Sequence, residues 1–119
     1  MKKIVSLMLM VAISVTSFGN NTKETATTVP DGKRLFAAKS CSACHNETVK
    51  VVGPSIKEIN AIYAKKEGDI FAFLKEKSDA IVDTDPGQVA IMKSNIDTIL
   101  KDISDTDLKA IITYMKSIE

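Results

Sequence analysis

Apolar residues recur at intervals of three and four along the second half of the chain, which is the period of an amphipathic α-helix. The longest stripe follows Ser104, a suitable N-cap, and consists of Leu108, Ile111, Ile112, Met115 and Ile118. This stripe predicts a helix over residues 105–118. No segment alternates apolar and polar residues as a half-buried strand does. The pattern therefore predicts an all-α domain of about four to five short helices.

Capping residues precede three further predicted helices. The caps, each with the helix that it begins, are Asp31 (residues 32–39), Ser55 (56–66) and Asp69 (70–77). Residues 78–87 hold three aspartates and the helix-breaking pair Pro86-Gly87, so we expect an irregular segment there. For residues 88–95 we expect a loop or a short helical turn, followed by a brief apolar helix within residues 96–103.

The first 19 residues have the layout of a secretory signal peptide, and we expect cleavage before Asn20. Lys2 and Lys3 form its basic start, and residues 4–15 form its apolar run. That run is shorter than the ~20 residues of a spanning helix, so we expect no stable membrane insertion of the mature chain. An uncleaved anchor is the alternative.

Behind the predicted signal peptide, residues 20–29 are polar and rich in threonine, which favours a flexible leader. Residues 30–119 then form the folded domain. We therefore expect an exported protein, in the periplasm or at the outer face of the cytoplasmic membrane. The formal net charge of +1 lacks the basic excess of a nucleic-acid-binding protein, so we expect no nucleic-acid partner.

Cys41, Cys44 and His45 form a Cys-x-x-Cys-His motif, the pattern of covalent c-type haem attachment. Two thiols can add across the two vinyl groups of a haem, and two intervening residues let one turn of chain present both sulfurs to one edge of the ring. His45 then lies beneath the iron, where a neutral imidazole is a good ligand. The motif contains the only histidine and both cysteines of the chain. It predicts one covalently bound haem c with its iron.

Three other chemistries fit the same residues less well. A disulfide between Cys41 and Cys44 would close a very small loop and constrain little. A thioredoxin-like dithiol would need a βαβ context, which the pattern lacks. A zinc site would need four ligands, and two cysteines with one histidine fall short.

The second axial ligand of the iron must be another residue type, because the chain has one histidine. A soft thioether sulfur is the natural choice. Beyond the predicted signal peptide the methionines are Met92 and Met115. Met115 lies on the terminal apolar stripe, where methionine usually fills the core. We predict that His45 and Met92 ligate the iron; otherwise Met92 only packs on the haem, and the sixth position holds water, a lysine or nothing.

Several motifs, in their order along residues 30–118, resemble those of small bacterial class I monohaem cytochromes c. The matching features are Gly32 and Phe36, the Cys41–His45 motif, Gly53-Pro54-Ser55, Met92-Lys93-Ser94-Asn95, and the terminal helix with Tyr114. The resemblance implies a class I cytochrome c fold, with its short helices wrapped around the haem.

The resemblance also implies roles for single residues. Pro54 should accept a hydrogen bond from His45 and so orient the iron ligand. Asn95 should donate a hydrogen bond toward the sulfur of Met92 or toward a haem propionate. Gly32 and Phe36 should pack on the terminal helix.

In function, the resemblance implies an electron carrier rather than an enzyme, which shuttles single electrons between redox partner proteins by transient docking. Lys39, Lys50, Lys57 and Lys93 flank the haem segments and form either a basic docking rim or ordinary solvated positions. One alternative is a haem protein with an open sixth site, such as a gas sensor or a peroxidase-like enzyme. Another is a cytochrome subunit of a larger oxidoreductase complex.

Overall fold

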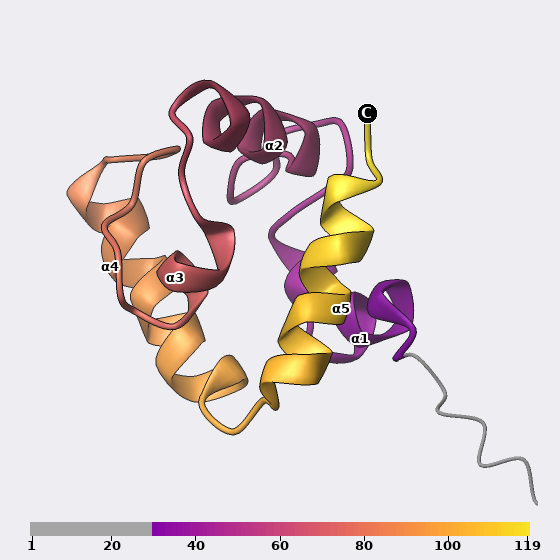
Figure 1. Ribbon diagram of the computed structural model, residues 1–119. Coiled ribbons are helices and arrows are strands. Elements are labelled where there is room, and N and C mark those ends of the chain that lie inside the picture. The colour runs from indigo at the N-terminus through magenta and orange to yellow at the C-terminus, as the bar shows by residue number, and fades with distance from the viewer. Residues whose placement is uncertain (1–29) are drawn as a thin grey trace, which may run out of the picture.

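The structure is a computed structural model that describes residues 30–119, so the predicted signal peptide and leader lie outside the described residues. Five α-helices dominate this part of the chain (Figure 1). They are α1 (Gly32–Ala38), α2 (Ile56–Lys65), α3 (Ile70–Leu74), α4 (Pro86–Asn95) and α5 (Asp105–Lys116). A 3₁₀ turn, η1 (Cys41–Ala43), and a π-helical segment, η2 (Ile96–Leu100), complete the order. Between residues 30 and 119 there is no strand, only an isolated bridge, so the all-α prediction is confirmed.

The predicted N-caps begin their helices as expected. Each cap oxygen accepts a hydrogen bond of 2.8–3.2 Å from a backbone N–H in the first turn, which satisfies one of the unpaired donors of a helix start. These caps are Asp31, Ser55, Asp69 and Ser104.

The prediction for residues 86–95 is wrong. They form a ten-residue helix, α4, instead of the end of an irregular segment and a loop or short turn. Asp85 caps this helix by accepting a hydrogen bond of 3.0 Å from the Gln88 amide. Pro86 occupies the first helical position, where its missing N–H costs nothing. Met92 therefore lies in the last turn of a helix rather than on a loop.

The first and last helices cross at Gly32. A Cβ atom built there would overlap the carbonyl oxygen of Ala110 and lie 2.9 Å from the Cβ of Tyr114, so only glycine allows this approach. Beside it, the rings of Phe36 and Tyr114 meet edge to face with their centroids 5.5 Å apart. Figure 1 shows α1 against α5. The predicted packing of Gly32 and Phe36 on the terminal helix is thus confirmed.

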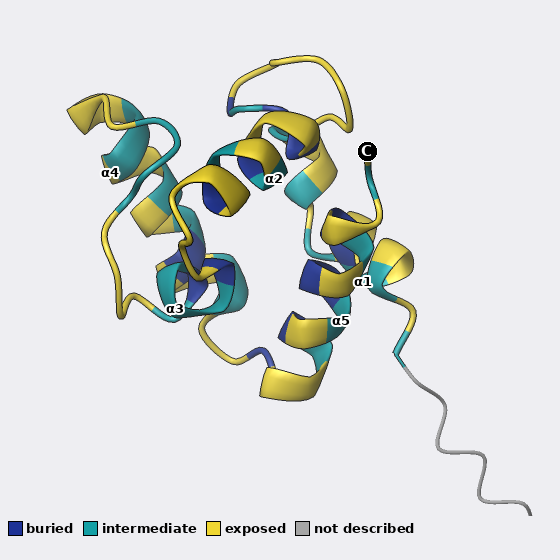
Figure 2. Cartoon of the chain, turned by 45° about the horizontal axis from the view of Figure 1, so that its top comes forward, coloured by how far each residue is buried: buried dark blue, intermediate teal, exposed yellow. Residues whose placement is uncertain are grey.

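The core is built from the inward faces of every α-helix except α4 (Figure 2). α4 has no fully buried residue and covers one side through partly buried side chains such as Met92. Asn60 on α2 fastens the end of α5, because its amide donates hydrogen bonds to the carbonyl oxygens of Met115 (2.7 Å) and Ile118 (2.9 Å). Among the described helices, none has the length and apolar character to cross a bilayer.

Candidate functional site

All five α-helices contribute side chains to one hollow in the middle of the domain. It encloses about 1020 Å³ of space between atoms, its open mouth included. The walls are mainly apolar, with Ile59, Phe73, Leu74, Leu108 and Ile111 among the lining residues. Such a hollow suits a flat apolar group.

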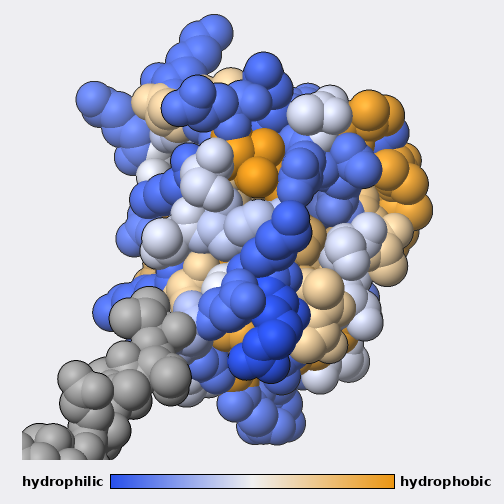
Figure 3. All heavy atoms as spheres, turned by 90° about the vertical axis from the view of Figure 1, so that its right-hand side faces the viewer, coloured by the Kyte–Doolittle hydropathy of each residue, from blue (hydrophilic) through white to orange (hydrophobic). Residues whose placement is uncertain are grey.

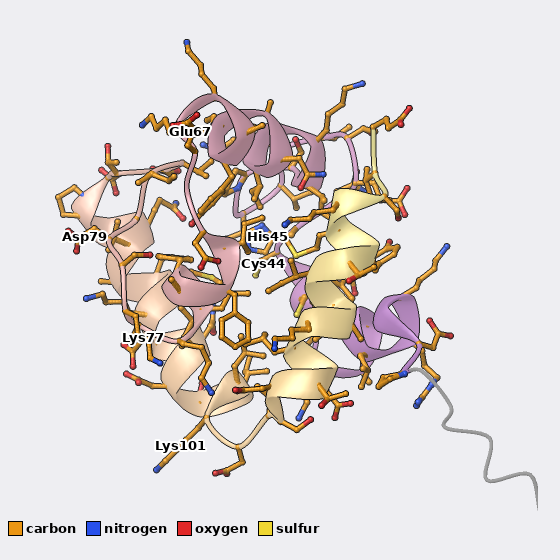
Figure 4. The ribbon with its side chains drawn as sticks, in the orientation of Figure 1. Cys44, His45, Glu67, Lys77, Asp79 and Lys101 are labelled. Carbon is orange, nitrogen blue, oxygen red and sulfur yellow. The ribbon has the colours of Figure 1, made fainter. Side chains whose placement is uncertain are left out.

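The six residues predicted from the sequence all border this hollow. They are Cys41, Cys44, His45, Pro54, Met92 and Asn95. Figure 4 shows Cys44 and His45 near the middle of the fold, with α5 on one side and α3 on the other. The fold thus brings together residues that lie far apart in the sequence.

A tight turn presents the two cysteines. Ser40 adopts a left-handed conformation (φ 58°), which turns the chain out of α1 and into η1. The amides of Cys44 and His45 then donate hydrogen bonds of 3.2 and 3.0 Å to the carbonyl oxygen of Cys41. Both cysteines are free, so the disulfide alternative is not formed. Burial raises the pKa of the Cys41 thiol, which keeps this group protonated at neutral pH.

His45 is held in one tautomer by Pro54. Its Nδ1 lies 2.8 Å from the Pro54 carbonyl oxygen, and because a carbonyl only accepts, Nδ1 carries the proton. Nε2 therefore keeps its lone pair, as a metal-ligating histidine requires. Gly53 packs against the ring, where an added Cβ would lie 2.6 Å from Cε1. The hydrogen bond that the resemblance implied is present, and both neighbours fix the imidazole.

Two methionines border the hollow from different helices. Met115 on α5 is 6% exposed and belongs to the core, whereas Met92 on α4 is only partly buried. Asn95 borders the hollow three residues after Met92. Figure 1 places α4 across the fold from α1, the helix that leads into the cysteine turn.

Three polar residues of the hollow are not predicted by the sequence: Tyr63, Asp83 and Gln88. Tyr63 lies in an apolar helical stripe, where periodicity indicates only burial. Asp83 pairs with Lys50 at 3.4 Å and so ties the loop after the cysteine turn to the segment before α4. The ammonium group of Lys50 therefore has a carboxylate partner in the described part of the chain. Within the described part of the chain, no three His, Cys, Asp or Glu side chains stand together as metal ligands.

Residues 29–119 match the family model described as Cytochrome c. The chain belongs to the cytochrome c family. It is 34% identical over 85 residues to Cytochrome c-552 of Nitrosomonas europaea, which covers 71% of this chain and 76% of that protein.

Two further relatives match over shorter stretches. Cytochrome c-551 of Stutzerimonas stutzeri is 50% identical over 38 residues, 32% of this chain and 36% of the relative. Cytochrome c-551 of Azotobacter vinelandii is 46% identical over 37 residues, 31% of this chain and 45% of the relative. The matches therefore span less than half the length of these two relatives.

The helical fold and these relatives together identify a small bacterial class I cytochrome c, whose cofactor is one covalently bound haem c with its iron. The residues present fit that group. Two thiols on one turn can hold one edge of the ring, the His45 imidazole is in the metal-binding tautomer, and the apolar walls accommodate the macrocycle.

Proposed function

We propose that this cytochrome c is an exported one-electron carrier whose iron is ligated by His45 and Met92. The observation that supports it most strongly is the hydrogen bond from His45 Nδ1 to Pro54, because it leaves Nε2 basic beside two thiols in an apolar hollow. When bound there, the haem supplies the ferric/ferrous couple. A thioether opposite an imidazole favours a high reduction potential and fills the sixth position, which leaves no coordination site for a substrate.

The chain's own residues serve this role in three ways. Pro54 orients the imidazole and Gly53 packs against it, so the ligand moves little between redox states. The apolar walls exclude water from the iron. Asn95 lies on the same helix as Met92 and borders the hollow, which supports the proposed role of its amide as a hydrogen-bond donor toward the Met92 sulfur or a propionate.

Electron exchange takes place where the hollow opens. Among the described residues, the exposed large apolar side chains are Val49, Val51, Val52 and Ile91, which are 45–61% exposed. Val52 and Ile91 also line the hollow, so its rim carries apolar surface from two segments. Figure 3 shows hydrophobic atoms gathered along one edge of the molecule. Exposed apolar surface marks interaction sites, and a small patch suits brief encounters with redox partners.

The test is absorption spectroscopy and redox titration of the protein purified with its haem. We expect reversible one-electron cycling, a weak far-red band of ferric iron bound to methionine sulfur, and no binding of carbon monoxide by the ferrous protein. Ready binding of carbon monoxide would contradict His/Met ligation and favour a sensor or peroxidase-like protein. Fractionation should recover a chain that begins near Asn20 outside the cytoplasm; stable co-purification with a membrane complex would indicate a subunit instead.

A further inference from the structure

An ion pair joins the two segments that form the apolar rim of the hollow. The Nζ atom of Lys50 lies 3.4 Å from Oδ2 of Asp83. Lys50 stands two residues before Val52, which lines the hollow from the loop that follows the cysteine turn. Asp83 lines the hollow itself and precedes α4, the helix that carries Ile91. The pair therefore connects the loop on one side of the rim to the helix on the other.

The loop on the Lys50 side has a fixed shape. The backbone of Lys50 forms an antiparallel bridge with that of His45. The Gly53 amide donates a hydrogen bond of 2.9 Å to the carbonyl oxygen of Cys44. Within the loop, the side-chain oxygen of Asn46 accepts hydrogen bonds of 3.0 and 3.1 Å from two backbone amides. Lys50 thus presents its cation from a fixed position beside the proposed iron ligand.

On the Asp83 side, α4 is held less firmly than the other α-helices. It has no fully buried residue, and among the described helices its main contacts are with η2, which continues it. The η2 end is anchored, because Ile96 is 5% exposed and belongs to the core. Figures 1 and 2 both show α4 at the edge of the fold. The N-terminal end of α4 is therefore the end that can move away from the hollow.

A short chain of hydrogen bonds connects the ion pair to that end of α4. The other carboxylate oxygen of Asp83, Oδ1, accepts a hydrogen bond of 3.1 Å from the amide of Asp85. Asp85 in turn caps α4, because its Oδ1 accepts a hydrogen bond of 3.0 Å from the Gln88 amide. Its carbonyl oxygen accepts another, of 2.9 Å, from the Val89 amide. The carboxylate of Asp83 thus links Lys50 to the first turn of α4.

We propose that Lys50 and Asp83 are positioning residues: their ion pair holds the N-terminal end of α4 against the hollow and so limits the access of external ligands to the iron. This inference rests on the proposed function and deepens it, because α4 carries Met92 and forms one wall of the haem site. The two side chains are 59% and 22% exposed, and exposed ion pairs stabilise only weakly. Here the pair acts on the local opening of one helix, so its loss should raise the open population about twofold to fivefold.

The experiment measures hydrogen exchange of the α4 amides and the rate at which the ferric haem protein binds cyanide. We expect Lys50→Gln to raise both rates about twofold to fivefold. Lys50→Arg keeps the cation and should match the parent. Lys75→Gln is the matched control, because it breaks the ion pair of 3.0 Å between Lys75 and Asp105, which joins the end of α3 to the start of α5. The control should change neither rate.

Unchanged exchange of the α4 amides in Lys50→Gln would overturn the proposal. An equal rise in α1 and α5 would overturn it too, since it would indicate a general loss of stability, and so would an equal effect of Lys75→Gln. Faster exchange without faster cyanide binding would overturn the claim that the pair limits access to the iron.

A second variant guards against a failure of the first to accumulate. Asp83→Asn removes the same attraction and keeps an oxygen for the Asp85 amide, so it is judged by the same outcomes. The far-red band of the parent tests the ligation by Met92 separately. Its absence would contradict the proposed function, whereas the exchange of the α4 amides would still decide whether the ion pair holds the helix.

Discussion

At the scale of single residues, the two methionines of the hollow can be told apart by the iron spectrum. Met92→Ala should lower the reduction potential, open the iron to carbon monoxide or cyanide, and remove the far-red band, because a thioether ligand is lost. Met115→Leu should do none of these, since it exchanges one core side chain for another of similar volume. The reverse result would transfer the ligand to Met115. Unaltered spectra in both variants would favour an open sixth site.

The two tyrosines should ionise late when the pH is raised. The pKa of Tyr63 is raised to about 12 by burial and by Asp69, and that of Tyr114 is raised by burial and by its hydrogen bond to Glu47. Less than half of the tyrosinate absorbance should therefore appear at pH 10, the ordinary pKa of tyrosine. A larger signal from the folded protein would contradict the raised pKa of these two phenol groups.

Ionisation of Tyr63 should also weaken the fold in alkali. Its pKa is higher in the folded chain than in the unfolded one, so its stabilising contribution is complete below about pH 10 and is lost as the pH rises toward 12. Tyr63→Phe should remove this part of the decline. Denaturant unfolding across that pH range measures it, and identical slopes in the parent and the variant would count against the effect.

At the scale of helices, the crossing of α1 and α5 depends on the absence of a side chain at Gly32. Gly32→Ala should lower the free energy of unfolding by about 1–3 kcal/mol, because the new methyl group meets the rigid backbone of Ala110. Gly87→Ala is the matched control: its methyl group would meet only a side-chain oxygen of Asp85, at 3.1 Å, and alanine favours the helix by up to ~1 kcal/mol. Thermal melts compare the two, and equal melting temperatures would contradict the close crossing.

The first residue of a helix was predictable where a single N-cap side chain binds a backbone amide a few residues further on. Ser55 and Asp69 cap their helices because the acceptor and the donor are only two or three residues apart. The pair Asp85-Pro86 is ambiguous at the same range, because proline both breaks helices and begins them. Because Pro86 was interpreted as a helix breaker, α4 was not predicted, and neither was the position of Met92 within a helix.

The same holds for the site: features that depend on residues close in sequence were predictable, and features that depend on distant residues were not. The cysteine turn is local, and the bond from His45 to Pro54 spans nine residues and matches a family pattern. The bond between Lys50 and Asp83 spans 33 residues. The place of Tyr63 in the wall of the hollow likewise depends on the other elements that pack around it. Periodicity gives the face on which a side chain lies, but not the partner that the fold brings to it.

At the scale of the whole molecule, the apolar rim of the hollow, which includes Val52 and Ile91, should control the rate of electron self-exchange. Val52→Lys should slow electron self-exchange between ferric and ferrous copies, because two added charges would meet where two rims touch. Thr113→Lys adds the same charge on the exposed face of α5, away from the hollow, and should have a much smaller effect. Proton NMR line widths of mixed redox states give the rate without a known partner. If both variants slowed self-exchange equally, the rim around Val52 would not be the surface through which electrons are exchanged.

The hollow also makes the haem part of the core, so the chain without it should not fold. Side chains from all five α-helices line this space, and a domain of this size has little other apolar area with which to offset the exposure of those walls. Cys41→Ala combined with Cys44→Ala prevents attachment and should give a product with little helix and no cooperative melt. Ser42→Ala, an exposed position between the two thiols, keeps both and should behave as the parent does. Circular dichroism of the three proteins measures this, and a native helix signal with a sharp melt in the double variant would show that the helices hold the hollow open by themselves.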